Sequence, residues 1–354
     1  MKKNVIKVVS FSLLLIMFTA VVNHALRWKD SLGIQYFYPM DKNIMDVMIF
    51  GSSHAEYSIN TAYLWDDYGI AAYSMSEGGQ NLGNTYYYMV EALKRQKPKV
   101  MAVELTFVAP GWEYAGISDG SIYRNTMNMK YSKNYWDNMN YSIEVAKELA
   151  SEEETKNLRK NILLQFPVYH TRYDDLTLTD FTIIHPELGR YEGSPRCVPQ
   201  EIPEAINCTD RSEEGYDAIC RREYVDKMIQ LCKENDVQLV FWIAPFAVDE
   251  EEMKVYNTTA DYVAEQGIPF INFSTPELQE EIGFDYATDM IEGNHVNFDG
   301  CRKMSTYWGK YLVDHYGIES RKGQSGYEIY DEISNNWHAA EERLREQYRV
   351  EMGQ

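Results

Sequence analysis

Short apolar runs and amphipathic stretches alternate along the chain between residues 46 and 316. The runs are typical of strands buried on both faces, and the stretches between them have a helical period. The expected strands are Asp46–Gly51, Ile70–Met75, Val100–Phe107, Gln238–Pro245 and Ile268–Phe273, with helices near 80–95, 215–235, 249–266 and 299–316. This pattern predicts a three-layer α/β/α domain, doubly wound and flavodoxin-like, with about five parallel strands.

The alternation is interrupted by a long insertion at residues 110–212, which is rich in tyrosine, asparagine and charge and contains a helical segment near 142–160. A connection of roughly 100 residues is too long for an ordinary crossover. We expect a cap over the carboxyl ends of the strands, where open α/β sheets bind ligands. A surface insertion with no role at the site is the alternative. The α/β domain then covers residues 45–316, and a charged helical tail follows at 319–354.

The amino terminus has the pattern of a membrane segment. Three lysines within the first seven residues precede the uncharged run Val8–Val22. Residues 1–28 are therefore predicted to be a signal anchor, with a cleaved signal peptide as the alternative. The best cleavage position, with Asn23 and Ala25 at its −3 and −1 sites, is poor. The positive-inside rule then predicts a single-pass protein of the cell membrane whose folded domain is extracellular.

The charge balance of the chain bears on whether its partner is a nucleic acid. The chain has 34 Lys and Arg against 54 Asp and Glu, a net charge of −20, and a pI near 4.8. Nucleic-acid binding requires a basic face, so we expect no nucleic-acid partner.

The five cysteines are expected to be structural. An exported protein can form disulfides, and we expect one bridge among Cys197, Cys208 and Cys220, with the pairing left open. Cys232 and Cys301 lie on helical faces and are predicted to be buried thiols. The chain has no Cys-x-x-Cys motif, so no zinc site is expected.

The first expected strand ends in Gly51-Ser52-Ser53 and is followed by the start of a helix. Such a strand-to-helix turn can expose a nucleophilic hydroxyl above the sheet, with the amide groups of the helix directed at the group it attacks. The alternative is that Ser52 or Ser53 simply caps the helix.

A second motif follows the fifth strand, where Glu292 stands three residues before His295 and Asn297 comes two residues after it. An acid at this spacing can hold the imidazole through its Nδ1 proton, leaving Nε2 free to accept a proton from a serine. Asp289 is the competing candidate for the orienting acid. His54 adjoins the serines but is expected to point elsewhere.

These motifs resemble the SGNH/GDSL hydrolases over roughly residues 45–110 and 215–316. Gly51-Ser52-Ser53 looks like the family's Gly-Asp-Ser block, residues 292–295 look like its Asp-x-x-His block, and the turn at residues 76–81 is similar to its second block. The resemblance implies Ser53 as the nucleophile, His295 as the base and Glu292 as the orienting acid. It also implies that the amides of Ser53 and Gly79 form the oxyanion hole.

The departures from the family pattern are specific. Ser52 and Glu292 each replace an aspartate, and the third block, Gly-x-Asn-Asp, is absent where the third strand ends. Thr106 or a residue of the cap is the candidate substitute for its oxyanion donor. Gly-Ser-Ser together with an amino-terminal anchor is most similar to the membrane-anchored proteins of cell-envelope acylation, of the D-alanyl-lipoteichoic acid and alginate O-acetylation type.

Within the insertion, His170 and Arg172 are candidate substrate-binding residues, and an exposed loop held by its own hydrogen bonds is the alternative. The sequence and the resemblance together predict an extracytoplasmic serine esterase or O-acyltransferase that acts on acyl esters of a cell-envelope polysaccharide or teichoic acid. No cofactor is expected. The acylated polymer and a membrane-bound O-acyltransferase are the expected partners. The alternative is a non-catalytic protein of the same fold that binds a polymer or that acyltransferase.

Overall fold

The computed structural model describes residues 2–28, 33–112, 116–117, 120–149, 151–176, 180–181 and 203–353. Five parallel strands form one sheet in the order β2-β1-β3-β4-β5. They are β1 (Val47–Phe50), β2 (Ala72–Ser74), β3 (Val100–Glu104), β4 (Gln238–Ile243) and β5 (Phe270–Asn272). Each strand lies within one of the five apolar runs, and the order is flavodoxin-like. The predicted α/β fold is confirmed.

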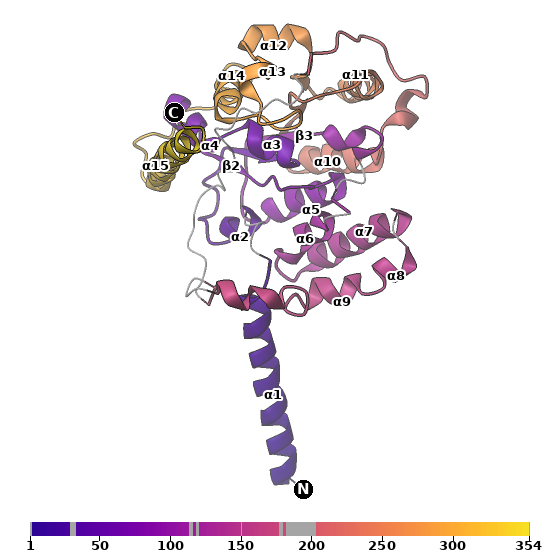
Figure 1. Ribbon diagram of the computed structural model, residues 1–354, viewed down its shortest axis with the longest axis vertical. Coiled ribbons are helices and arrows are strands. Elements are labelled where there is room, and N and C mark those ends of the chain that lie inside the picture. The colour runs from indigo at the N-terminus through magenta and orange to yellow at the C-terminus, as the bar shows by residue number, and fades with distance from the viewer. Residues whose placement is uncertain are drawn as a thin grey trace.

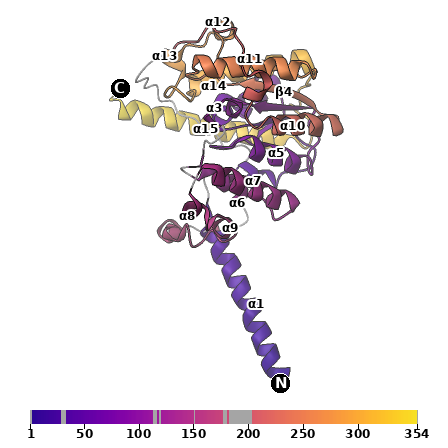
Figure 2. The same cartoon turned by 90° about the vertical axis from the view of Figure 1, so that its right-hand side faces the viewer.

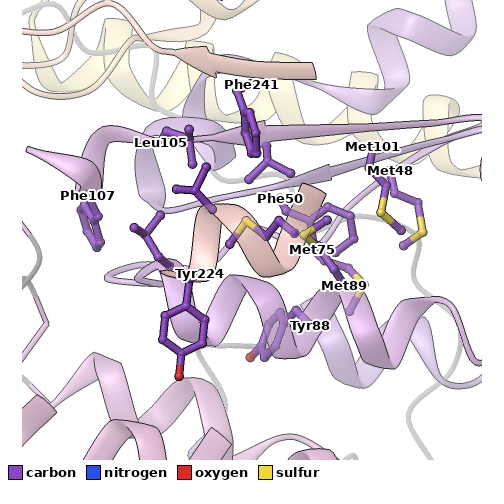
Figure 3. Packing of buried hydrophobic residues seen from close by; sticks show 14 of the residues in the cluster. Met48, Phe50, Met75, Tyr88, Met89, Met101, Leu105, Phe107, Tyr224 and Phe241 are labelled. Atoms are coloured by element: carbon purple, nitrogen blue, oxygen red, sulfur yellow. The ribbon is translucent and has the colours of Figure 1, made fainter. Parts of the chain in front are cut away.

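Alternate side chains of each strand enter two separate cores, as the two-residue repeat of a strand requires. In β1, Met48 and Phe50 belong to one core, whereas Val47 and Ile49 belong to the other. Figure 3 shows the first core, where methionine side chains pack between the sheet and α5 (Leu82–Ala92). Burial on both faces explains why the strands are almost continuously apolar in sequence.

Helices cover both faces of the sheet (Figures 1 and 2). With α5, the helices α10 (Arg222–Glu234) and α11 (Glu250–Ala264) pack on the methionine-rich core, and α4 (Thr61–Tyr68) and α14 (Phe298–Tyr316) pack on the opposite core. The other described elements are α1 (Lys2–Ala25), α2 (Gly33–Phe37), α3 (Ser53–Ser58), η1 (Thr106–Val108), α6 (Ser121–Met127), α7 (Lys133–Leu149), α8 (Glu152–Thr155), α9 (Leu158–Leu163), η3 (His170–Asp175), η5 (Gly215–Ala218), α12 (Pro276–Ile282), α13 (Tyr286–Asp289) and α15 (Glu328–Glu351).

Helix α1 projects away from the folded domain (Figure 1). Among the described residues, it is the helix long and apolar enough to cross a membrane, over Lys3–Ala25, and its apolar window is exposed along its length. Exposed apolar surface of this extent is unfavourable in water. The apolar run is therefore not a core helix of the domain.

The insertion lies only in part over the strand ends, as a cap would, where Ser121 and Asn125 of α6 contact the turn at residues 78–79. Helices α6 and α7 pack against α5, and α8 and α9 pack on these two helices and continue toward the end of α1 (Figure 2). The helical segment expected at 142–160 is three helices, and α7 begins earlier because Tyr135, Met139 and Ile143 bury one of its faces. These helices form a further layer outside α5, on that face of the sheet. The insertion residue Trp112, at its start, borders the candidate site, and residues 182–202 lie outside the described part of the chain.

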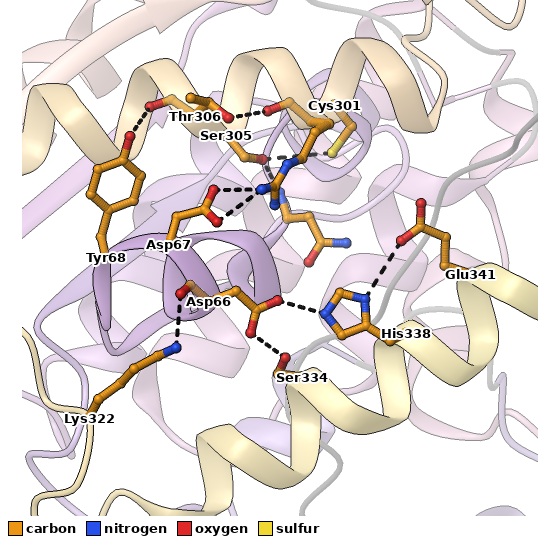
Figure 4. A network of polar contacts seen from close by, with 12 residues as sticks. Asp66, Asp67, Tyr68, Cys301, Ser305, Thr306, Lys322, Ser334, His338 and Glu341 are labelled. Carbon is orange, nitrogen blue, oxygen red and sulfur yellow. Dashed lines mark hydrogen bonds and ion pairs between the residues drawn. The ribbon is translucent and has the colours of Figure 1, made fainter.

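The carboxy-terminal tail is a packed helix, α15, which lies against α4. Asp66 of α4 accepts hydrogen bonds from the hydroxyl of Ser334 and from Nε2 of His338, the latter at 2.7 Å (Figure 4). Trp337 is 1% exposed and meets Phe298 edge-on at 5.2 Å. The same apolar cluster contains residues 290 and 296, which flank the turn that carries His295. The tail therefore supports one wall of the candidate site.

The cysteines follow the prediction in part. Cys232 and Cys301 are buried thiols, as predicted, and burial raises the pKa of each to about 12. Cys208 and Cys220 are not bonded to each other. Cys197 lies outside the described residues, so a bridge that involves it stays a prediction.

Replacing Trp337 should test whether α15 is part of the fold. We expect Trp337→Ala to lower the free energy of unfolding by about 3–5 kcal/mol, because it empties a large buried site. The matched control is Trp136→Ala on α7, whose side chain is 42% exposed, for which we expect a loss below about 1 kcal/mol. Urea unfolding of the two variants measures the difference. Equal, small losses would show that α15 does not contribute to stability.

Candidate active site

The turn between β1 and α3 presents a serine hydroxyl at the carboxyl edge of the sheet. Gly51 has a φ of +148°, and a Cβ at this position would lie 2.6 Å from the Cβ of Glu104, so the turn requires glycine. Ser52 caps α3, since its Oγ accepts a hydrogen bond from the His54 amide at 3.2 Å. Ser52 is 1% exposed, whereas Ser53 is half-buried. The capping role and the accessible hydroxyl thus belong to different serines.

His295 lies on a tight turn between α13 and α14. The Ile291 amide donates to the His295 carbonyl at 2.8 Å, and the Ala247 amide, after β4, donates to the Gly293 carbonyl at 2.7 Å. Asn297 then caps α14, accepting hydrogen bonds from the first amides of that helix. These bonds fix the turn to the carboxyl end of the sheet.

The structure brings together the three residues predicted to form the relay. Nε2 of His295 lies 2.8 Å from Oγ of Ser53, and its Nδ1 contacts Oε1 of Glu292. Nδ1–H can donate to the carboxylate, which leaves Nε2 as the acceptor for the serine proton. Asp289, the competing acid, is buried and pairs with Nζ of Lys303 at 2.7 Å. Glu292 is therefore the acid in position to orient the imidazole.

Aromatic rings hold His295 against α3. The ring of His54 stacks on His295 at 5.4 Å, and the ring of Tyr57 lies 4.8 Å from it. His54 and Tyr57 are three positions apart and share a helix face. Phe246 and Trp112 enclose His54 at 4.8 and 5.5 Å. The expectation that His54 points elsewhere was wrong, because it forms part of the surface on which His295 rests.

His54 itself is held neutral. Its side chain is buried, and this burial, followed by the nearby His295, lowers its pKa to about 3 from an ordinary value of 6.5. Its Nδ1 lies 3.1 Å from Oγ of Ser52. A neutral imidazole at this pKa does not compete with His295 as a base near neutral pH.

A buried acid, Glu104, lies beneath the nucleophile turn. It ends β3 and accepts hydrogen bonds from the Ser52 hydroxyl at 3.0 Å, the Ser52 amide at 3.5 Å and the Thr106 amide at 2.5 Å. The Thr106 hydroxyl donates to it as well. Burial raises the pKa of Glu104, and these hydrogen bonds act in the opposite direction. Glu104 therefore joins the ends of β1 and β3, the point where the strand order reverses.

The groups considered as oxyanion donors differ in whether they already donate a hydrogen bond within the protein. Within the described residues, the amides of Ser53 and Gly79 donate no hydrogen bond to the protein. The turn that carries Gly79 is tied to the nucleophile turn, because the Glu77 amide donates to the Gly51 carbonyl at 3.2 Å. Gly79 has a φ of +61°. Its role as a donor stays a prediction, and Thr106 does not supply a third donor, because both its amide and its hydroxyl are used by Glu104.

His170 and Arg172 do not lie at this site. Arg172 donates through Nη1 to the carbonyls of Ala25, at 3.3 Å, and Arg27, and it pairs with Asp180 at 3.2 Å. His170 is exposed on η3, which Arg172 ties to the end of α1. Helix α3 lies on the far side of α5 from α1 (Figure 1). The carbonyls at the end of α1 lack helical partners, and Arg172 satisfies them. The prediction that these two residues bind substrate at Ser53 is corrected.

Three residues of the site, Glu104, Tyr57 and Trp112, were not predicted from the sequence. The sequence did contain a signal for Glu104, because it is an acid at the end of an apolar run and therefore at the carboxyl edge of the predicted parallel sheet. No such local signal marks Trp112, because its contact with His54 depends on the path of the insertion. Among the described residues, no three His, Cys, Asp or Glu side chains are arranged as metal ligands.

Comparisons with known proteins give distant similarity. No protein-family model and no curated protein sequence matches the chain. A Bacteroides fragilis protein provisionally described as an acylhydrolase aligns over 80% of this chain and 95% of its own, with 8% identity and a TM-score of 0.39. A gut microbial diltiazem-metabolizing enzyme aligns over 78% of this chain and 47% of its own, with 11% identity and a TM-score of 0.34. The fold assignment therefore rests on the strand order, not on these alignments.

The low pKa of His54 predicts a specific loss of stability in acid. Below pH 6.5 the unfolded chain binds a proton at His54 that the folded chain refuses, so stability falls as the pH falls toward 3. At pH 4.5 this contribution is roughly 2–3 kcal/mol. We expect His54→Gln to lose less stability between pH 7.5 and 4.5 than the unsubstituted chain does, by about that amount. Urea unfolding at the two pH values measures it.

The control for this experiment is His170→Gln, because His170 is exposed. It should follow the unsubstituted chain at both pH values. Parallel losses in all three proteins would contradict the assignment of the acid sensitivity to His54.

Proposed function

We propose that the chain is a membrane-anchored serine esterase or O-acyltransferase of the SGNH/GDSL type. In this proposal Ser53 attacks the carbonyl carbon of an acyl ester, His295 accepts the serine proton and passes it to the leaving alcohol, and Glu292 orients His295. The resulting acyl-serine is then cleaved by water or by a hydroxyl group of a cell-envelope polysaccharide or teichoic acid.

One observation carries the proposal, namely the continuous contact from Glu292 through His295 to the half-buried hydroxyl of Ser53. Ser53 and His295 are 242 residues apart in sequence, so local chain geometry does not account for their contact. The base is oriented by a carboxylate and touches an accessible hydroxyl, which is the arrangement that activates a serine nucleophile. The amides of Ser53 and Gly79, which donate to no described residue, support an oxyanion hole, usually the largest catalytic contribution.

The anchor in the proposal is supported by α1 and by the hydrogen bonds at its carboxyl end. The helix is apolar, exposed and of the length that spans a bilayer. Asn23, near its end, accepts hydrogen bonds from the amides of Gln165 and Phe166 at 2.6 and 3.1 Å. Cleavage after Ala25 would remove these bonds, so they favour an uncleaved anchor over a cleaved signal peptide. The extracellular location is inferred from the lysines that precede the helix.

Glu292→Gln tests the catalytic part of the proposal. The glutamine amide can hold the imidazole in the tautomer that leaves Nε2 protonated and unable to accept the serine proton. We expect kcat/KM for 4-nitrophenyl acetate to fall by about 10²- to 10⁴-fold. Asp289→Asn is the matched control, because Asp289 pairs with Lys303 and not with His295. It should lower stability while leaving turnover per folded molecule nearly unchanged.

The reverse result, with Asp289→Asn inactive and Glu292→Gln active, would contradict the assignment of the acid. Absence of esterase activity in the folded, unsubstituted chain would favour the alternative of a non-catalytic binding protein. Release of acetate from an O-acetylated polysaccharide, or of D-alanine from lipoteichoic acid, by the same set of variants tests the substrate class.

A further inference from the structure

A groove with a volume of about 1050 Å³ lies between the carboxyl-terminal half of α1 and the domain, and Ser53 is not part of its lining. Its α1 wall is one face of the helix, which includes Leu15, Ile16, Ala20 and Asn23, and the wall continues past the end of the helix to Arg27. The spacing of these residues matches a helical repeat. The groove is therefore continuous from the apolar part of the anchor to the point where the chain enters the domain.

The groove is held open by specific bonds at the end of α1. In addition to the contacts of Asn23, the Trp28 amide donates to Oε1 of Gln165 at 3.0 Å. Arg172 donates to the carbonyls of Ala25 and Arg27. These bonds fix the direction in which α1 leaves the domain, so the groove is a built feature of the fold.

The lining of the groove changes from apolar to polar along α1. On the domain side, the apolar lining includes Leu163, Leu164 and Phe181, and Leu164 and Phe181 are exposed. Asn23 lies about 12 Å from Leu15 along the helix axis. One leaflet contributes about 15 Å of hydrocarbon, so with Asn23 at the interface the apolar end lies at the depth of lipid chains.

The groove is also lined by two cations, Arg27 and Lys130, that form no ion pair with a carboxylate of the described residues. Arg27 is 8% exposed and donates to Oε1 of Gln35 at 3.2 Å and to the His24 carbonyl at 2.5 Å. Nζ of Lys130 lies 4.3 Å from the centre of the Tyr38 ring. The ion pairs of the described residues include neither cation, although the chain has a net charge of −20. Burial and the nearby Arg172 lower the pKa of Arg27, and Tyr36 acts in the opposite direction.

We propose that this groove binds one anionic phospholipid of the outer leaflet, with the headgroup phosphate at Arg27 and Lys130 and an acyl chain along Leu15–Ala20. The assignment rests on α1 spanning the membrane, as in the proposed function. A second transmembrane helix is the other occupant to consider, but an apolar helix would leave both cations without an anion. A bound lipid would fix the height and tilt of the domain above the membrane.

The test uses the full chain in detergent, titrated with phosphatidylglycerol or phosphatidylcholine, with bound lipid counted by native mass spectrometry. We expect one phosphatidylglycerol to bind more tightly than phosphatidylcholine. The double variant Arg27→Gln/Lys130→Gln should weaken phosphatidylglycerol binding by about 30-fold, the effect of two charges near a membrane surface, and weaken phosphatidylcholine binding less, because the choline ammonium offsets its phosphate. Ala20→Trp, which fills the apolar end, should weaken the binding of both lipids.

Two controls match these variants. Lys133→Gln removes an exposed lysine outside the groove, and Val21→Trp adds a large side chain to α1 at a position that does not line the groove. Both should bind lipid as the unsubstituted chain does. Three results would each overturn the lipid site. They are equal binding of the two lipids, unaltered lipid binding by Ala20→Trp, and a dimer of the chain that Ala20→Trp separates into monomers.

Vesicle flotation and hydrolysis of 4-nitrophenyl acetate, measured on the same samples, separate this site from the proposed function. A chain that floats and hydrolyses the ester but retains no phosphatidylglycerol would overturn the lipid site alone. A chain that retains the lipid and hydrolyses nothing would overturn the enzyme proposal alone. A chain that does not float would overturn both the anchor and the lipid site.

Discussion

The proposed active site depends on one hydrogen bond, the 2.8 Å contact between Nε2 of His295 and Oγ of Ser53. The serine follows β1 and the histidine precedes α14, so the bond exists because the parallel sheet brings both loops to its carboxyl edge. Each loop is fixed separately, by Gly51 and the cap of α3 on one side and by the cap of α14 on the other. The contact is thus a consequence of the fold, and the chemistry proposed for the chain depends on the contact.

A second layer of buried polar groups supports this contact without taking part in it. Glu104 binds the Ser52 hydroxyl and amide, and His54, kept neutral by burial, provides the surface on which His295 stacks. This layer distinguishes two adjacent serines that look equivalent in sequence. The Ser52 hydroxyl points inward, where it donates to Glu104 and caps α3, and the Ser53 hydroxyl faces the imidazole of His295. At the other end of the domain, Arg172 performs a comparable structural task for α1.

The sequence predicted those features that have a local or periodic signal. The five strands and their flanking helices followed from apolar runs buried on both faces, and the serine, histidine and glutamate followed from the loops after the first and last strands. Glu104 and His54 were missed as supports because their roles depend on contacts between β1, β3 and the turn before α14. His170 and Arg172 were misplaced for a related reason, since nothing in their sequence indicates that the insertion passes beneath α5 to the end of α1. The support that α15 gives to the His295 turn is likewise a tertiary contact, made through Trp337.

The most direct test of the central claim is the covalent reaction of the full chain with a fluorophosphonate, located by mass spectrometry of its peptides. Activation of Ser53 by His295 predicts one phosphonate adduct on Ser53, lost in Ser53→Ala and in His295→Ala. The adduct should persist in Ser52→Ala at a temperature where that variant is folded, because the Ser52 hydroxyl is turned toward Glu104. An adduct on Ser52, or no adduct on the folded chain, would contradict the activation of Ser53 by His295.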